Sequence, residues 1–305
     1  MAQQNSSNLL AHLALLGAAL IYGANYVIAK SVMPDPMPAN GFILMRVLGA
    51  GLLFWLIKAN IREKVAPKDL LRLAICGLLG VATNQLFFFN GLEITSPLNA
   101  AIIMTSNPIL VMIMASVVLR NPITVRKTVG VLLGAAGAIG IILLSANSSS
   151  GLSSVKGDLF ILINSMSYGI YLVIVKPLMS KYKPITVISW AFFFGALFVT
   201  PVGVGEFVTI PWGELDAWQI FSAAFVVLFV TFFAYLFNIY ALKRVQPTVA
   251  SSYIYLQPIL AGIFTWLFSL YTDIQYAGDF SWWKVIFGMA IVTGVWLVSR
   301  SSKRE

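Results

Sequence analysis

The side chains best suited to binding chemistry are amides, tyrosines and one arginine, all placed inside long apolar stretches. The segment MTSNPILV carries Asn107 and Pro108 in the middle of an apolar run. Proline removes a backbone hydrogen bond and kinks a helix, and an adjacent amide can pair with the freed backbone groups or with a ligand. A similar pair, Gln257 and Pro258, follows 150 residues later. We therefore predict paired bends, or hinges, at Pro108 and Pro258, with both amides near a binding path.

Other polar and aromatic side chains share helical faces, because positions i, i+4 and i+7 lie on one side of a helix. Unsatisfied polar groups are costly in hydrocarbon, which favours faces turned toward protein or a wet cavity. Such side chains either contact a substrate or serve as hydrogen-bond partners between helices, and both interpretations stay open. The predicted substrate-binding residues are Tyr22, Asn25, Arg46, Asn84, Phe88, Asn107, Tyr168, Tyr171, Trp190, Tyr235, Asn238 and Gln257; Asn164 and Thr231 share faces with members of this set.

The amino-acid composition indicates that the helices carrying these faces lie in a membrane. The 305 residues are 59% hydrophobic and 10% charged, with a mean hydropathy of +0.87. Crossing the hydrocarbon core takes about 20 apolar residues. The sequence predicts an all-α polytopic protein with ten transmembrane helices, at 9–29, 39–58, 70–91, 97–119, 124–144, 157–176, 184–204, 217–240, 246–270 and 281–299.

The net charge is +9, and the distribution of the basic residues indicates how the protein is oriented in the membrane. With the N-terminus inside, all but four of the 20 basic residues fall at cytoplasmic loops or ends, the exceptions being Lys30, Arg46, Lys156 and Lys284. This is the positive-inside pattern, and it predicts cytoplasmic N- and C-termini. We expect a bacterial inner-membrane protein whose surroundings are the lipid bilayer, with no nucleic-acid partner.

The chain contains an internal repeat. The segment YGANYVIAK, starting at Tyr22, pairs with YGIYLVIVK, starting at Tyr168, and the two proline motifs continue the match. Five spans per copy is an odd number, so the second copy enters the membrane from the opposite side. We predict two inverted five-helix repeats, at 1–146 and 157–305, joined by an outer Ser-rich linker at 147–156.

Inverted repeats are a recurrent construction of secondary transporters. The sequence holds no HExxH, GxSxG or phosphate-binding loop, and we predict neither an enzyme nor a metal or cofactor site. The polar faces are rich in amides and aromatics with at most one strong cation, which favours neutral or zwitterionic metabolites, such as amino acids or aromatic or purine-like compounds. We predict an exporter or exchanger that works by alternating access; a solute channel and a proton-coupled drug/metabolite antiporter remain the alternatives.

Three residues bear on these alternatives. Arg46 is the charge most clearly inside a span, where it marks a functional site or extends to the interface. His12 lies a turn from the start of its span, which favours an interfacial histidine over a proton relay. No acidic residue occupies the centre of a span; Asp158 lies at the outer end of its own. We therefore expect net flux to follow the substrate gradient.

The segment from Gly91 to Leu144, with its alanine-rich span, central proline and glycine-rich last span, resembles the EamA-type repeat of the drug/metabolite transporter superfamily. NGFILMRVLGAGLLFWL, which includes Arg46, is similar to the second span of that repeat. The resemblance implies ten helices, with spans one to four and six to nine around a central cavity. The chain departs from the family's pattern by Asn121, where an acid is frequent, and by an extra loop at 269–283 of unknown role.

Glycines at 130, 134, 137 and 140 give the fifth span a smooth face. This face favours close packing within the chain over a homodimer seam, although it is compatible with both.

Overall fold

The computed structural model describes residues 2–119, 125–146, 154–245, 249–250, 253–271 and 281–301. The first half contains α1 (Ala2–Lys30), α2 (Ala39–Ala59), α3 (Pro67–Gly77), the π-helix η1 (Leu78–Thr83), α4 (Asn84–Ile94), α5 (Pro97–Met104), α6 (Asn107–Leu119) and α7 (Val125–Ala146). The second half contains α8 (Val155–Lys181), α9 (Pro184–Phe207), α10 (Ala217–Phe225), the π-helix η2 (Val226–Phe233), α11 (Ala234–Leu242), the 3₁₀ turn η3 (Tyr253–Leu256), α13 (Gln257–Ser269) and α14 (Trp282–Ser301). No strand occurs within these ranges. Most of the predicted linker at 147–156 and of the loop at 269–283 lies outside the described residues.

The helices are apolar enough to form a multi-pass membrane bundle. Six helical segments have the length and hydropathy to cross a membrane: Leu9–Lys30, Ala39–Ala59, Pro67–Ile94, Val155–Lys181, Pro184–Phe207 and Ala217–Leu242. Four shorter apolar helices accompany them: Pro97–Val111, Thr128–Leu144, Tyr253–Ser269 and Trp282–Gly294. The prediction of an all-helical polytopic membrane protein is confirmed.

Local sequence explains where several helices begin. Ser96 caps α5 by accepting a hydrogen bond from the Asn99 backbone N–H at 3.1 Å, and Pro97 occupies the first turn, where no amide donor is needed. Asp216 and Gln219 form a reciprocal capping box at the start of α10, with both hydrogen bonds at 2.8 Å. These caps satisfy backbone donors that the hydrocarbon could not.

The two proline motifs coincide with interruptions in helices. A turn at Thr105 and Ser106 separates α5 from α6, which begins at Asn107. In the second half, η3 ends at Leu256 and α13 begins at Gln257. Pro108 and Pro258 each stand in the first turn of an α-helix, which follows the turn at Thr105 and Ser106 in the first half and the 3₁₀ turn η3 in the second.

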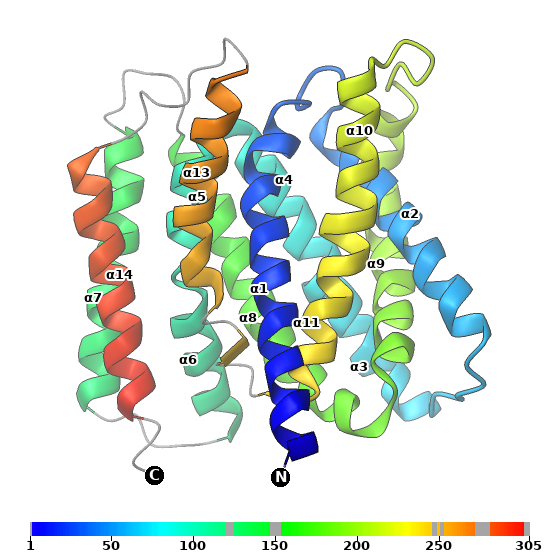
Figure 1. Cartoon of the computed structure of the whole chain (residues 1–305), viewed down its shortest axis with the longest axis horizontal. Helices are drawn as coiled ribbons and strands as arrows, with labels where there is room; N and C mark the ends of the chain where they lie inside the picture. The colour runs from blue at the N-terminus through cyan, green and yellow to red at the C-terminus, as the bar shows by residue number, and fades with distance from the viewer. Residues whose placement is uncertain are drawn as a thin grey trace.

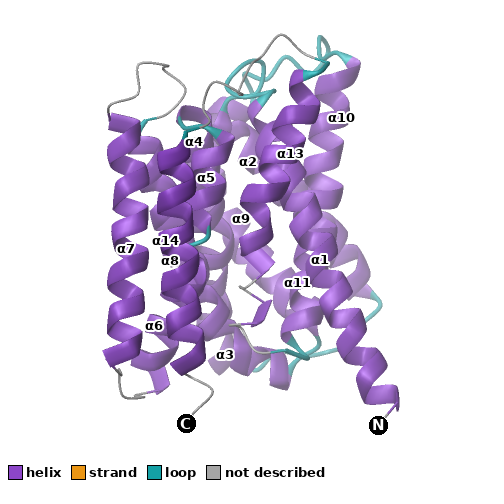
Figure 2. Cartoon of the chain, turned by 60° about the vertical axis from the view of Figure 1, so that its left-hand side comes forward, coloured by secondary structure: helices purple, strands orange, loops and turns teal. Residues whose placement is uncertain are grey.

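Glycines allow close approach between helices. A Cβ added at Gly137 of α7 would lie 2.6 Å from the Phe287 carbonyl oxygen of α14, and one at Gly91 of α4 would lie 2.9 Å from the Gly157 carbonyl oxygen of α8. Small residues at such contacts strengthen packing where no hydrophobic effect operates between helices. The glycine face of α7 thus packs within the chain, against α14, and this pair lies at one edge of the bundle (Figures 1 and 2).

The start of α1 and the end of α14 lie at the same end of the bundle (Figure 1). The segments flanking the central space come from both halves, since α1 packs against α11 and α13, and α8 packs against α4 and α6. A site at the centre of the molecule is therefore built from the two halves together.

Candidate functional site

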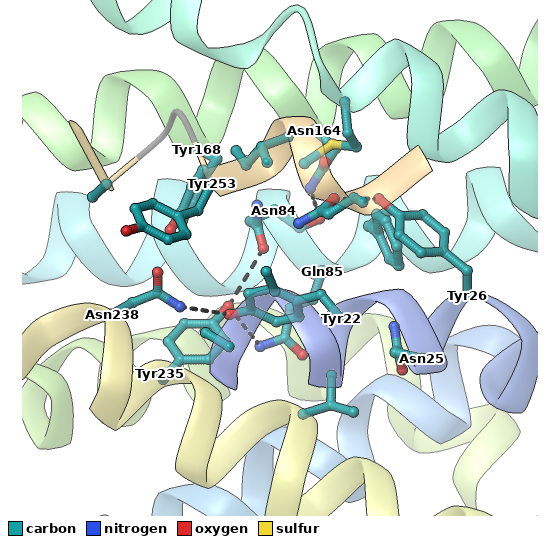
Figure 3. Close-up of a pocket in the computed structure, with 18 of the residues that line it drawn as sticks. Tyr22, Asn25, Tyr26, Asn84, Gln85, Asn164, Tyr168, Tyr235, Asn238 and Tyr253 are labelled. Atoms are coloured by element: carbon teal, nitrogen blue, oxygen red, sulfur yellow. Dashed lines mark hydrogen bonds between the residues drawn. The ribbon is translucent and has the colours of Figure 1, made fainter. Parts of the chain in front are cut away.

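A cavity of about 90 Å³ lies at the centre of the bundle, lined by α1, α2, α4 and α5 from the first half and by α8, η2, α11, η3 and α13 from the second. Figure 3 shows its amide and tyrosine side chains pointing toward one another from these helices. The lining residues are Leu15, Ala18, Ala19, Tyr22, Asn25, Tyr26, Arg46, Asn84, Gln85, Phe88, Phe89, Met104, Asn164, Tyr168, Val230, Tyr235, Asn238, Ala250, Tyr253, Ile254 and Gln257.

Nine of the twelve predicted substrate-binding residues line this cavity: Tyr22, Asn25, Arg46, Asn84, Phe88, Tyr168, Tyr235, Asn238 and Gln257. Asn164, which shares a helical face with Tyr168, lines it too. Residues that helical spacing assigned to inward-facing helix faces, such as Tyr22 and Asn238, therefore lie around one cavity although they are more than 200 positions apart in the chain.

The other three predicted residues lie elsewhere. Asn107 is buried where α6 meets α8, and its side-chain amide donates a 2.7 Å hydrogen bond to the Ser165 carbonyl. Tyr171 is buried with its ring against Gly80. Trp190 packs in an aromatic cluster with Trp55, their ring centroids 5.4 Å apart. Each of these three side chains, which the sequence predicted to bind substrate, instead contacts a neighbouring helix.

Tyr235 is the centre of the hydrogen-bond network in the cavity. Its hydroxyl lies 3.2 Å from the Gly80 carbonyl and 3.4 Å from Asn84 Oδ1, which share its one proton as acceptors, and it accepts from Gln85 Nε2 at 3.4 Å. The Gly80 carbonyl belongs to the π-helix η1, so this contact joins η1 of the first half to α11 of the second. The π-helix thereby fixes the position of a cavity tyrosine.

A second set of bonds joins the two halves directly. Tyr26 on α1 donates to Gln257 Oε1 at 2.7 Å, and Asn238 Nδ2 donates to the Tyr22 hydroxyl at 3.1 Å. Gln257 is the residue that opens α13 after the break. The side chain predicted to sit beside a bend is therefore tied to the wall of the cavity.

Arg46 is the one cation among the described residues lining the cavity, and none of those residues is acidic. Its Nε donates to Thr231 Oγ1 at 2.9 Å, and its guanidinium carbon lies 4.1 Å from the centroid of the Phe89 ring. Thr231 in turn donates to the Val226 carbonyl, five residues earlier within η2. The structure thus places Arg46 facing the cavity, 2% exposed.

Within the described part of the chain, four buried polar atoms on cavity residues have no hydrogen-bond partner. They are Arg46 Nη1, Asn25 Oδ1, Gln85 Oε1 and Asn164 Oδ1. A buried polar group left unpaired costs about 1–3 kcal/mol. One charged donor and three amide acceptors are therefore available in this cavity to a partner from outside the chain.

Two lysines secure helix ends at opposite ends of the bundle. Lys30 at the end of α1 donates to the carbonyls of Leu92 in the last turn of α4 and Thr95 just after it. Lys176 near the end of α8 donates to those of Leu242, the last residue of α11, and Val245 beyond it. Cations are favourable beside the unpaired carbonyls at a helix C-terminus. The corresponding positions of the two YGxxxVIxK segments thus make corresponding contacts.

Sequence reasoning missed several lining residues. Tyr26 follows Tyr22 by four positions and so shares its face, which was a usable signal. Gln85 follows Asn84 directly and carried no periodic signal of its own. Tyr253, whose hydroxyl lies 2.7 Å from His12 Nδ1, sits in the 3₁₀ turn, where α-helical spacing does not apply.

Comparison with known proteins places the chain in one family. The model of the EamA-like transporter family matches twice, over residues 9–143 and 155–300. The chain is 24% identical over 299 residues to the uncharacterized transporter YyaM of Bacillus subtilis, covering 96% of this chain and 97% of that one. It is 22% identical over 331 residues to the protein WALLS ARE THIN 1 of Arabidopsis thaliana, covering 96% and 83%.

A crystal structure shares the fold with a TM-score of 0.62, over 99% of this chain and 100% of that one, at 17% identity. An uncharacterized transporter of Archaeoglobus fulgidus is 24% identical over 289 residues, covering 94% of this chain and 96% of its own. Because the family model covers both halves, the expected resemblance is confirmed: the chain belongs to the EamA-like transporter family and is a multi-pass membrane protein of a transporter lineage.

Proposed function

We propose that this protein is a secondary transporter that exports or exchanges small neutral or zwitterionic metabolites by alternating access. The observation that carries the proposal is the central cavity, whose walls combine residues from both halves of the chain. Tyr22 and Asn238, Tyr26 and Gln257, and Arg46 and Thr231 each form a bond between the halves. A carrier that moves one half against the other would remodel this cavity first.

The proposed architecture is two inverted five-helix repeats, at 1–146 and 157–305. The double family match supports it, as do the α-helix starts at Asn107 and Gln257 and the lysine contacts of Lys30 and Lys176. The positive-inside pattern supports cytoplasmic termini. The proposed location is the bacterial inner membrane. We propose Pro108 and Pro258 as the hinges, because each stands where its helix restarts.

The proposed substrate class follows from the cavity's chemistry. One guanidinium with an unpartnered Nη1 can hold a single carboxylate, and the free oxygens of Asn25, Gln85 and Asn164 can accept from an amine or amide. Tyrosine and phenylalanine rings supply apolar walls for an aromatic or aliphatic body. Phosphorylated sugars would usually enlist several Lys or Arg side chains, and the described lining offers one such cation.

Counterflow in proteoliposomes tests the proposal. A thermal-shift screen of the purified protein against a metabolite library identifies the ligand, and radiolabelled uptake is then measured into vesicles loaded with the same compound unlabelled. A carrier shows saturable uptake that is accelerated by internal substrate. Unsaturable uptake without acceleration would indicate a channel, and uptake of phosphorylated sugars in preference to zwitterions would contradict the substrate class.

A further inference from the structure

Tyr253 belongs both to the wall of the central cavity and to its rim. It lies in the 3₁₀ turn η3 and lines the cavity, where Figure 3 shows it among the other tyrosines. Its hydroxyl lies 2.7 Å from Nδ1 of His12 on α1, and the centroids of the two rings are 6.0 Å apart. The His12 side chain is exposed. A single tyrosine side chain therefore connects the inside of the cavity with the surface of the bundle.

The contact lies toward the end of the bundle at which α1 begins. Leu15, one turn after His12, lines the cavity and is 1% exposed, and Ala11 is fully buried. The start of α1 and the end of α14 share this end (Figure 1), which the positive-inside pattern predicts to be cytoplasmic. The contact between His12 and Tyr253 thus stands between the cavity and the cytoplasmic end.

Two side-chain contacts hold η3 and the start of α13 against α1. One joins His12 to Tyr253, and the other is the 2.7 Å hydrogen bond that Tyr26 donates to Gln257. A 3₁₀ turn has poorer backbone hydrogen-bond geometry than an α-helix, so its position depends more on such side-chain contacts. Loss of the contact at Tyr253 would free the cytoplasmic end of η3, while Gln257 keeps the start of α13 attached to α1.

The repeat-related positions at the other end of the bundle are packed differently. The offset of 146 that relates the two YGxxxVIxK segments pairs His12 with Asp158, and the offset of 150 pairs Tyr253 with Ile103. Asp158 and Ile103 are both 0% exposed. Asp158 accepts a hydrogen bond from the Thr95 hydroxyl, and Ile103 is not among the residues that line the cavity. The cytoplasmic contact, which includes an exposed side chain, is therefore the easier of the two to open from this conformation.

We propose that Tyr253 is the gate residue at the cytoplasmic end of the cavity and that His12 is the positioning residue that holds it closed. The inference rests on the proposed alternating access and adds the side chain that separates the cavity from the cytoplasm. A neutral imidazole can accept from the tyrosine hydroxyl and a protonated one can donate to its oxygen, so the contact forms in both states. The gate opens when this contact breaks and the Tyr253 ring moves away from α1 together with η3.

The test measures access to the cavity from each side of the membrane. Ala18→Cys, at a residue that lines the cavity, supplies a reporter thiol in the full-length protein with Cys76→Ser. Its rate of reaction with a membrane-impermeant methanethiosulfonate is measured in right-side-out and in inside-out vesicles. His12→Ala should raise the rate from the cytoplasmic side about two- to ten-fold, the factor that one hydrogen bond contributes, and should not raise the rate from the outside.

Further variants separate the contact from a general effect on the fold. Tyr253→Phe keeps the ring but removes the hydroxyl and should raise the cytoplasmic rate by the same factor, and combining it with His12→Ala should add nothing, because both changes remove one contact. His12→Asn places an amide near the position of Nδ1 and should restore the wild-type rate. Tyr240→Phe is the matched control. The Tyr240 ring, near the end of α11, lies 3.6 Å from the Arg244 guanidinium carbon and does not line the cavity, so loss of its hydroxyl should leave the rate unchanged.

The two vesicle orientations and a transport assay decide between the outcomes. An unchanged cytoplasmic rate in both His12→Ala and Tyr253→Phe would overturn the proposal, and so would equal increases from both sides, which indicate a loosened fold. Counterflow separates this proposal from the proposed function. Saturable counterflow with unchanged labelling would reject the gate alone, whereas the expected labelling without counterflow in the wild type would reject the carrier alone.

Discussion

Replacing Arg46 with glutamine separates substrate recognition from fold stability. In the folded protein the buried guanidinium has a hydrogen bond to Thr231 at 2.9 Å and the Phe89 ring at 4.1 Å. A hydrogen bond by a charged group contributes about 1.5–3 kcal/mol, and a desolvated cation–π contact about 2 kcal/mol. Together they offset the several kcal/mol that burying a charge costs. Arg46→Gln should therefore change stability by about 1 kcal/mol or less, because the cost and its compensation are removed together.

Arg46→Gln should reduce the affinity for a carboxylate ligand by much more than it changes the stability of the fold. Loss of a charge-assisted hydrogen bond of about 1.5–3 kcal/mol weakens binding about 10- to 150-fold. The assay compares the affinity of a zwitterionic ligand with that of its carboxamide, in the wild type and in Arg46→Gln. The wild type should prefer the carboxylate by this factor and the variant should not, while Arg62→Gln, at an exposed position, should behave as the wild type. An unchanged preference together with a large fall in melting temperature would show that Arg46 serves only packing.

Three further predictions concern hinges, energy coupling and packing. Pro108→Ala and Pro258→Ala should bias the protein toward opposite openings, measured by cysteine accessibility from the two faces; the same change in both would contradict the inverted-repeat account. A pH difference of about two units, equivalent to roughly 2.7 kcal/mol per proton, should not drive accumulation of a non-titrating substrate in proteoliposomes; accumulation that His12→Ala abolishes would establish proton antiport instead. Gly137→Ala should lower the free energy of unfolding by about 1–3 kcal/mol, and with it the melting temperature, because the added Cβ would press on a backbone carbonyl of α14. Gly262→Ala, with nothing within 4 Å of the new Cβ, should be neutral or slightly stabilising, and equal losses in both would refute the packing argument.

Much of the fold was predictable because hydrophobic length is set by the bilayer. The apolar runs located the helices, and the odd number of spans per copy led to the prediction of inverted repeats. The π-helices η1 and η2 could not be predicted, since Leu78–Thr83 and Val226–Phe233 read as ordinary apolar helix. Contacts such as that of Glu206, whose carboxylate accepts from the Asn40 backbone N–H at 2.7 Å, join positions 166 residues apart. A single sequence contains no signal for such a pairing.

The site was predictable as far as helical periodicity holds. Tyr22 and Asn25 on α1 and Asn238 on α11 line the cavity because polar side chains in hydrocarbon turn inward. Periodicity does not distinguish a face that borders a cavity from one that borders another helix, and Tyr171 borders another helix for that reason. Asn107, predicted from its place beside Pro108, also lies against a helix, where its amide donates to the Ser165 carbonyl of α8. Their burial depends on which helix packs opposite, and that is a property of the whole bundle.

Alternating access is tested most directly by locking one end of the bundle at a time. At one end the Trp218 Nε1 donates to Ser31 Oγ at 3.1 Å, and near the start of α1 His12 Nδ1 lies 2.7 Å from the Tyr253 hydroxyl. Cysteine pairs at 31/218 or at 12/253, in a Cys76→Ser background, are bridged with a reducible bis-methanethiosulfonate linker and assayed for counterflow. Bridging either pair alone should reduce exchange to the rate of empty liposomes, and reduction should restore it. Exchange that continues at full rate with either end bridged would contradict alternating access through the central cavity.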